Sequence, residues 1–282
     1  MKKPSPLAIT LTILAVITGA LVALSGFYVD WLWFNSVGFT GVWSTVLTTK
    51  VALFVIAGLL TSLIISLNVY IAFRRRPFYV PSSVEADNLE RYRATIDPIR
   101  KLVFAGIVLV LFYFGGTSAS NLWGSWLLFS NSTEFGVKDP QFGLDISFFA
   151  FRLPFWQTLI GWGISTLILA TLASAAVHYL YGGIRPQVPQ ERTTVAARVQ
   201  LSVLLGLIVL LKAVAYWFDR YALALKESRL ITGLTYTDVN ATLPAKSILA
   251  AIAVICSLLF FANIVRKSWL LPAAGTALMV GA

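Results

Sequence analysis

Long apolar runs separated by short charged segments are the dominant pattern along the chain. A helix needs about 20 mostly apolar residues to cross a hydrocarbon core about 30 Å thick, because each residue rises about 1.5 Å. Cutting the sequence at its charged residues predicts six such spans, at about 7–29, 51–73, 102–121, 155–181, 199–218 and 247–265. The predicted fold class is therefore all-α, a polytopic membrane helix bundle with six full transmembrane helices and a partial seventh.

The two ends of the chain need separate interpretation. Only 15 residues follow Lys267, so 269–282 is predicted as the partial seventh span. We expect the sequence to be a piece of a longer protein rather than to end in an interfacial tail. At the other end, Lys2 and Lys3 precede an apolar run that contains the cleavage-like sequence Ala23-Leu24-Ser25. This run is too long for a typical signal peptide, so we expect a retained helix.

The composition agrees with a membrane protein. Hydrophobic residues make up 58% of the chain and charged residues 12%, with a mean hydropathy of +0.80. Soluble domains carry about 25% charged residues. An ordinary water-soluble enzyme with one buried core is therefore excluded.

The net charge of +10 would suggest nucleic acid in a soluble protein, but here the charges divide unevenly between the two predicted faces. With the N-terminus inside, the cytoplasmic segments hold 14 Lys and Arg and a net charge of +9. The outer loops hold seven Lys and Arg and a net charge of zero. Because cytoplasmic loops carry the excess of Lys and Arg, we expect a multi-pass plasma-membrane protein with a cytoplasmic N-terminus. Its expected partner is the lipid bilayer, and no nucleic acid.

Residue types that support catalysis or metal binding are scarce. The chain has one Cys, Cys256, and one His, His178, which excludes a disulfide framework and Cys-rich or His-cluster metal sites. The motifs His-Glu-x-x-His and Gly-x-Ser-x-Gly and a phosphate-binding glycine loop are also missing. We therefore assign no catalytic, cofactor-binding or metal-ligating residue, expect no cofactor, and do not expect an enzyme.

The first predicted cytoplasmic loop, 74–101, begins with three consecutive arginines. Within it, Ser82 and Glu85 form a capping box, which predicts a cytoplasmic surface helix at 82–98. We interpret this helix as lying against the membrane face or the bundle. The alternative is a docking site for a cytoplasmic partner or an anionic lipid.

Two predicted outer segments are rich in aromatic residues. The first is a loop at 30–39, and the second is an outer aromatic loop at 122–153, which follows a break at Gly115-Gly116 and includes a short interfacial helix. Trp and Phe concentrate where hydrocarbon meets headgroups. We therefore interpret these residues as an aromatic belt.

Asp139 and Asp145 lie in the most unusual part of the outer aromatic loop. We expect both carboxylates to cap turns and to pair with Lys138 and Arg152. The alternative is a divalent cation site shared with other outer acids, namely Asp30, Asp219 or Asp238. No ligand spacing here matches a known cation-binding loop, so the turn-capping role is favoured.

The predicted spans contain few polar groups. Lys212 is the only charged residue within one, and it is expected to extend toward the headgroups or pair with Asp219, with a pathway role as the alternative. His178 is expected to hydrogen-bond a carbonyl, and Asn68 and Asn263 to bond neighbouring helices. Small residues four positions apart predict close helix packing at Gly19/Ala23, Ala170/Ser174, Ser247/Ala251 and Ala273/Ala277/Gly281.

Three stretches carry a resemblance to a known family. They are Asp30-Trp31-Leu32-Trp33-Phe34, the sequence from Asp139-Pro140-x-Phe142-Gly143 through Asp145-x-Ser147-Phe148 to Leu153-Pro154-Phe155, and Tyr236-Thr237-Asp238-Val239 with Leu243-Pro244-Ala245. The chain resembles an uncharacterised family of large bacterial membrane proteins of actinobacteria, cyanobacteria and some firmicutes. The resemblance implies about seven N-terminal spans followed by a large extracytoplasmic domain, and places this chain in a bacterial plasma membrane.

Three functions remain open at this point. The favoured one is a membrane anchor or scaffold for an extracytoplasmic assembly, with its own outer domain or other membrane helices as partners. The second is a transporter or channel subunit, motivated by the number of spans, Lys212 and the outer acids. The third is an envelope-facing membrane enzyme, which rests only on Asp139 and Asp145.

Overall fold

The computed structural model of the chain describes residues 5–77, 97–186, 192–227, 232–266 and 270–281. Its main helices are α1 (Pro6–Ser36), α2 (Thr40–Arg74), α4 (Arg100–Ser120), α5 (Trp123–Ser130), α6 (Leu153–Leu180), α7 (Val195–Ala222), α8 (Leu243–Arg266) and α9 (Leu270–Gly281). Four short helical turns accompany them, η1 (Asp97–Ile99), η2 (Phe148–Arg152), η3 (Leu223–Leu225) and η4 (Asp238–Thr242). Within the described ranges β-structure is limited to isolated bridges. The all-α prediction is confirmed.

In the part of the chain that the structure describes, six helices are long and apolar enough to cross a membrane. They are the helices of 10–36, 40–74, 97–120, 148–180, 195–225 and 238–266. Each overlaps one of the six predicted spans, although the bounds differ by several residues at one or both ends. α9, where the partial span was predicted, has 12 residues. Residues 82–96 of the predicted surface helix lie outside the described part of the chain, and Asp97-Pro98 belong to η1.

The chain divides into two compact units, Met1–Ala52 and Leu53–Ala282. In the first unit, α1 turns into α2 and the ring of Phe27 lies 5.0 Å from that of Trp43. The expected loop at 30–39 was wrong, because α1 remains helical to Ser36. The helix ends only where Gly38 adopts a φ of 75°, a backbone conformation that glycine adopts without steric penalty.

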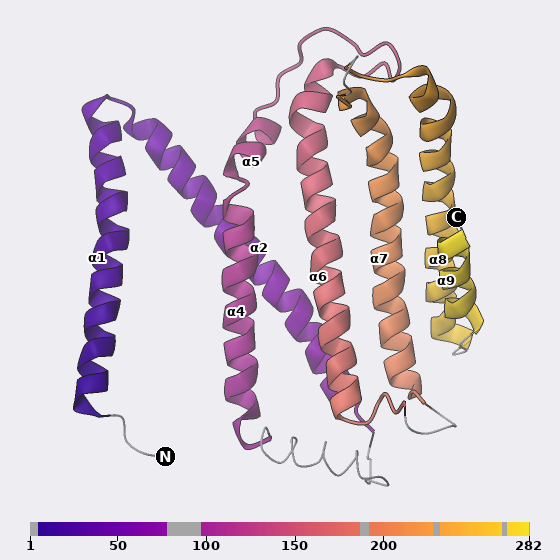
Figure 1. Ribbon diagram of the computed structural model, residues 1–282, viewed down its shortest axis with the longest axis horizontal. Coiled ribbons are helices and arrows are strands. Elements are labelled where there is room, and N and C mark those ends of the chain that lie inside the picture. Colours follow the sequence, from indigo (N-terminus) through magenta and orange to yellow (C-terminus); the bar gives the residue numbers. More distant parts are fainter. Residues whose placement is uncertain (1–4, 78–96, 187–191, 228–231, 267–269, 282) are drawn as a thin grey trace. The chain divides into compact units, whose positions relative to one another are not determined.

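The second unit is a helix bundle with two distinct ends (Figure 1). At one end lie α5, the start of α6, the end of α7 and the start of α8, and we call this the aromatic end. At the other end lie the last residues of α2, the start of α4, the end of α6 and the start of α7, and we call this the arginine end. The helices α6, α7 and α8 run between the two ends in alternating directions.

Three glycines bring α2 and α4 into close contact. A Cβ at Gly58 of α2 would lie 2.7 Å from the carbonyl oxygen of Phe112, and one at Gly116 of α4 would lie 2.7 Å from that of Phe54. A Cβ at Gly115 would lie 2.8 Å from the Thr61 side chain. The expected break at Gly115-Gly116 was therefore wrong. The helix continues through both residues, because the missing side chains let two backbones approach.

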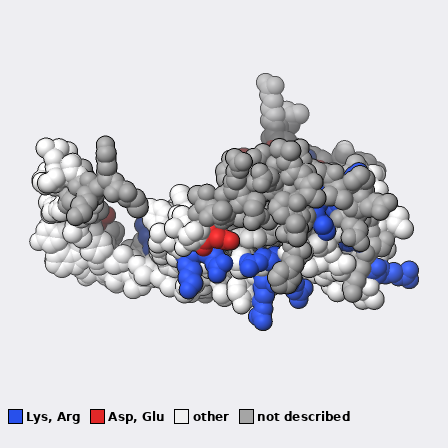
Figure 2. Space-filling model, turned by 90° about the horizontal axis from the view of Figure 1, so that it is seen from below, with Lys and Arg blue, Asp and Glu red and all other residues white. Residues whose placement is uncertain are grey.

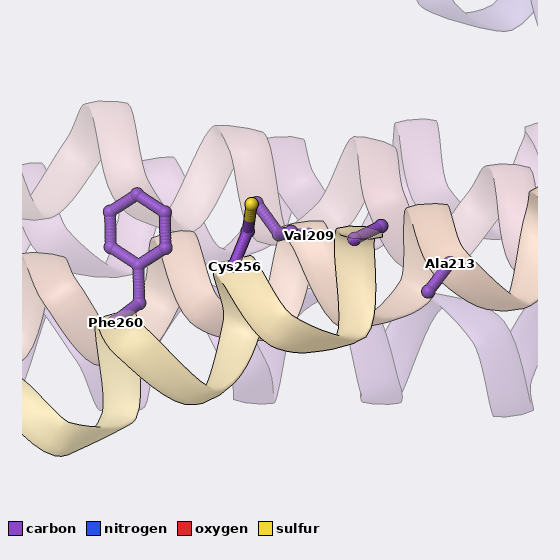
Figure 3. Close-up of a cluster of buried hydrophobic side chains, with 5 residues drawn as sticks. Val209, Ala213, Cys256 and Phe260 are labelled. Atoms are coloured by element: carbon purple, nitrogen blue, oxygen red, sulfur yellow. The ribbon is translucent and has the colours of Figure 1, made fainter. Parts of the chain in front are cut away.

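The contact between α7 and α8 contains the main hydrophobic core (Figure 3). Its buried members are Val209, Ala213, Ala253, Cys256 and Phe260. Two hydrogen bonds join the same helices, since Asn263 Nδ2 donates to Ser202 Oγ at 2.7 Å and Ser257 Oγ donates to the Gly206 carbonyl at 2.9 Å. The interhelical role predicted for Asn263 is confirmed.

A second core joins α2, α6 and α7 through Ile65, Ala170 and Leu204. Ala170 and Ser174 are both fully buried, as their spacing predicted. In α9 the observed contact differs from the predicted stripe. Gly275 packs against Phe260 of α8, whereas Ala273, Ala277 and Gly281 are exposed.

Candidate functional site at the aromatic end

The aromatic end is built by segments that are distant in the sequence. The short helix α5 and the connection 131–147 lie beside the start of α6 and the end of α7, and η4 leads into α8 (Figure 1). The expected outer aromatic loop at 122–153 is thus a folded element, with α5 inside it, as predicted, and η2 closing it. It holds the candidate site residues that the sequence suggested, Asp139 and Asp145.

Aromatic rings form a continuous cluster under these segments. Successive ring centroids lie 4.2 to 6.4 Å apart through Trp126, Phe129, Phe155, Trp156, Phe218, Tyr221, Phe142 and Phe149. Contacts at these distances are favourable beyond the area they bury. We call these eight residues the aromatic cluster. The belt interpretation placed such rings at the headgroups and did not anticipate that they pack on one another.

Asp145 holds the segment that precedes α6. Its Oδ1 accepts hydrogen bonds from the amides of Phe135 at 3.1 Å and Ser147 at 2.8 Å, and its Oδ2 accepts from Gly136 at 2.9 Å. Hydrogen bonds from the Ser147 side chain and from these amides stabilise the ionised carboxylate and lower the pKa of Asp145 to about 2. A carboxylic acid with this pKa is ionised at neutral pH and holds its proton too weakly to act as a general acid.

Asp139 holds the preceding turn in a similar way. Its Oδ2 accepts from the amides of Gln141 at 3.0 Å and Phe142 at 2.7 Å, and the turn closes at Gly143 with a φ of 67°. The turn-capping interpretation of both aspartates is confirmed. The pairing expected with Arg152 was wrong, because its Nε donates to Ser132 Oγ at 3.1 Å.

The cation site considered from the sequence does not assemble. Across the described ranges no three His, Cys, Asp or Glu side chains lie close enough together to hold a metal ion. Asp139 and Asp145 direct their oxygens at backbone amides, and Asp219 accepts from Lys246 at 3.5 Å.

Asp238 is the most enclosed acid at this end, with 2% of its surface exposed. Lys226 Nζ lies 2.9 Å from Oδ1 and 3.2 Å from Oδ2, and Thr235 Oγ1 donates to Oδ2 at 2.7 Å. The Asp238 amide donates to Thr235 Oγ1 at 3.1 Å and the Thr235 amide donates to Asp238 Oδ2 at 3.1 Å, so the two residues form a reciprocal capping box. This role of Asp238 was not predicted, although the spacing Thr-x-x-Asp before an apolar run is its signal in the sequence.

The helices α6 and α8 begin in the same way. Each follows a π-turn, in which the amide of Leu153 donates to the carbonyl of Phe148 and that of Leu243 to the carbonyl of Asp238. Proline is the second residue of both helices. A proline ring clashes with the carbonyl four residues earlier in a regular helix, and a π-turn displaces that carbonyl. Residues 145–154 and 235–244 thus lead into α6 and α8 through the same backbone arrangement.

A polar network lies inside the bundle, nearer the arginine end. Gln200 Nε2 donates to the backbone carbonyl of Asn68 at 2.8 Å, which fixes the orientation of the amide. Gln200 Oε1 can only accept, so His178 Nε2 donates to it at 3.0 Å. The carbonyl expected as the partner of His178 is therefore that of a glutamine side chain, and Gln200 itself was missed because its neighbours are separated widely in sequence.

Lys212 lies within α7, and its Nζ is 4.8 Å from the centre of the Tyr216 ring, one turn toward the aromatic end. This contact agrees with the expected extension of the lysine toward that end. The expected pairing with Asp219 was wrong, because Asp219 pairs with Lys246.

Comparison with known proteins adds the family. A family profile described as "Uncharacterised protein family (UPF0182)" matches residues 7–282. A UPF0182 protein of Streptomyces coelicolor is 49% identical over 279 residues, covering 97% of this chain and 28% of the relative. One from Nocardioides is 44% identical over 278 residues, covering 99% of this chain and 28% of the relative. The chain thus spans 28% of the length of these curated relatives. No solved structure matches.

Proposed function

The chain belongs to the uncharacterised protein family UPF0182, and from this premise we propose that it is the membrane anchor of a larger extracytoplasmic assembly. The six helices long and apolar enough to cross a membrane supply the anchor. The longer relatives supply the reason to expect an assembly, because this chain accounts for 28% of their length.

The main observation that supports this proposal is that the connections between helices at the aromatic end are held in fixed positions. Asp145 and Asp238 use their oxygens to hold backbone and side-chain donors in fixed positions, and the aromatic cluster packs the connections onto the ends of α6 and α7. A surface that must hold an attached domain benefits from rigid connections between helices, because a rigid surface loses less entropy on binding. Trp126 and Trp156 remain 38% exposed and offer apolar area for that contact.

The proposal includes an orientation, with the aromatic end outside and the arginine end in the cytoplasm of a bacterial plasma membrane. The excess of Lys and Arg on the segments next to the arginine end supports it. The partners are then the bilayer, an extracytoplasmic polypeptide and neighbouring membrane helices.

Site-specific crosslinking tests the anchor. A photoreactive residue is placed at Glu134, exposed at the aromatic end, and as a matched control at Lys101, exposed at the arginine end. In the protein of its native length, produced in cells, we expect adducts from position 134 with extracytoplasmic polypeptide segments, identified by mass spectrometry. Adducts with lipid alone from position 134 would contradict an anchor.

A transporter or channel subunit is the second candidate, and the buried network of His178, Gln200 and Asn68 is the observation that favours it. Polar groups inside a bundle are frequent in solute and proton pathways. Reconstituted vesicles that move a solute, and lose this flux when Gln200 is replaced by Leu, would support it over the anchor.

We propose that the chain has no enzymatic role of its own. The envelope-facing enzyme rested on Asp139 and Asp145, and both carboxylates serve as hydrogen-bond acceptors for turns.

A further inference from the structure

A pocket of about 400 Å³ lies at the arginine end, where α2 stops. Tyr70, Phe73, Arg74, Arg76 and Pro77 line it. Its volume is within the range of small-ligand sites. Figure 2 views the molecule from this end and shows Lys and Arg side chains gathered on it.

Guanidinium groups converge on one ring beside this pocket. Arg76 lies 4.0 Å from the centre of the Phe73 ring, and Arg100, from the start of α4, lies 5.7 Å from the same centre. Both distances are within cation–π range, so the ring contacts two cations, one just after α2 and one from the start of α4. Arg76 is also 5.4 Å from the ring of Tyr181, which follows α6.

The charge around the pocket remains positive after its local acid is counted. Asp97 accepts a hydrogen bond from the Tyr181 hydroxyl at 3.2 Å, and within the described ranges no carboxylate forms an ion pair with Arg74, Arg76 or Arg100. The C-terminus of α2 adds a partial negative charge of about half a unit. Among the described residues around the pocket, three arginines outweigh one carboxylate and this partial charge, and this balance favours an anion.

An apolar track leads along α2 to the pocket. Leu63, Leu67 and Tyr70 are 62%, 52% and 51% exposed, and their spacing places them on one face of the helix that ends in Arg74. An acyl chain packed on this face would bring its headgroup to the arginines. Free phosphate could also reach the arginines, but it would make no contact with the apolar track.

We propose that this pocket binds the phosphate of an anionic glycerophospholipid, with an acyl chain along Leu63, Leu67 and Tyr70. Arg74 and Arg76 contact the phosphate, since guanidinium groups present paired donors to it. Tyr70 and Phe73 lie at the level where chain and headgroup meet, a position that aromatic rings favour. Basic pockets at the membrane edge bind anionic headgroups in this way.

The test is native mass spectrometry of the detergent-purified protein titrated with dioleoyl phosphatidylglycerol. Arg74 and Arg76 line the pocket. The variant Arg74→Gln is expected to weaken lipid binding about fivefold, and the double variant Arg74→Gln/Arg76→Gln about 25-fold. Arg75→Gln is the matched control, because it removes the same charge from an exposed position that does not line the pocket. It is expected to weaken binding less than twofold.

Further titrations separate the sources of the anion. Dioleoyl phosphatidylcholine is expected to bind at least tenfold more weakly, and neither inorganic phosphate nor chain-free glycerophosphoglycerol is expected to displace the bound lipid. Equal losses of lipid affinity for Arg75→Gln and Arg74→Gln would show that the lipid binds to diffuse surface charge and not in the pocket. Displacement of the lipid by inorganic phosphate would show that the site recognises phosphate alone and not a lipid. Thermal melting checks folding, and Arg74→Gln alone, which removes no described hydrogen bond, keeps the test valid if the double variant does not fold.

Discussion

At the scale of single residues, three acidic side chains at the aromatic end hold nearby segments in place through hydrogen bonds. Asp139 and Asp145 each accept from amides in a turn, and Asp238 combines a capping box with the Lys226 ammonium. The sequence predicted the turn-capping role of the first two from their neighbouring proline and glycine. It could not place Lys226 beside Asp238, because 11 residues of the sequence separate them.

Asp145 provides a test at this scale. Asp145→Asn removes the charge that three amides stabilise, so faster hydrogen exchange is expected at Phe135, Gly136 and Ser147, measured by mass spectrometry at neutral pH. Glu134→Gln removes a neighbouring exposed charge and is expected to leave these rates unchanged. Equal effects of both variants would show that charge, not the hydrogen bonds, matters.

The pH dependence of the same group follows from its pKa of about 2, which lies below the value of about 3.9 for an unfolded Asp. A lowered pKa contributes stability that is complete above the unfolded value and is lost as pH falls through the folded value. The connection 135–147 is therefore expected to loosen between about pH 4 and pH 2. NMR of the Asp145 carboxyl carbon checks this, and a midpoint near 4 would contradict it.

At the scale of elements, glycines decide which helices approach closely. Gly58, Gly115 and Gly116 join α2 to α4, and Gly206 lets α7 reach Phe261 of α8. Sequence spacing identified Ala170/Ser174 correctly, but it took Gly115-Gly116 for a break. Two adjacent glycines permit either outcome, and only the neighbouring helix determines which one occurs.

Gly116→Ala tests the contact between α2 and α4. The added Cβ would lie 2.7 Å from the Phe54 carbonyl oxygen, and overpacking of this kind costs about 1–3 kcal/mol. Gly106→Ala, on the same helix, meets nothing within 4 Å and is expected to be neutral or to stabilise by up to about 1 kcal/mol. Unfolding in detergent measures both, and the expectation fails if Gly116→Ala is as stable as Gly106→Ala.

Gln200 tests the polar network that links α2, α6 and α7. Gln200→Leu leaves His178 Nε2 and the Asn68 carbonyl without this partner, with an expected loss of about 1–2 kcal/mol in unfolding free energy. Gln157→Leu on α6 is the control, since Gln157 makes no hydrogen bond to the described residues. A loss no larger than that of the control would mean that the network contributes little to stability.

At the scale of the whole molecule, the distribution of charge sets the expected orientation. At the aromatic end, acidic side chains pair with lysines or accept hydrogen bonds from turns. The arginine end contains Arg74, Arg75, Arg76, Arg100 and Lys101. In the proposed orientation, the anchor surface and the lipid pocket lie on opposite sides of the bilayer.

The single cysteine makes this orientation testable. Cys256 is fully buried in the core between α7 and α8, so Cys256→Ala provides a background for introduced cysteines. With Glu134→Cys we expect labelling by a membrane-impermeant maleimide in intact cells, and with Lys101→Cys only after the cells are opened. The reverse pattern would invert the orientation, and labelling of both in intact cells would contradict a spanning bundle.

The sequence by itself determined the fold class, the number of full spans and the family, because about 20 consecutive apolar residues have few alternatives to a membrane helix. It placed helix ends less well. The spans are predicted by cutting the sequence at charged residues, but α2 begins at Thr40, ten residues before Lys50. Likewise, α1 continues past Asp30 and ends only near Gly38, which has a positive φ.

Only the tertiary structure decided which polar residues meet. Four contacts join residues that are separated in the sequence. They are the hydrogen bond of Gln200 to Asn68, the ion pair of Asp238 with Lys226, the glycine contacts between α4 and α2, and the contact of Arg100 with the Phe73 ring. Apolar composition specifies that a helix is buried in lipid or protein but not which face touches which neighbour, because lipid and protein interiors are equally apolar. Packing of small residues and hydrogen-bond geometry therefore select the neighbours.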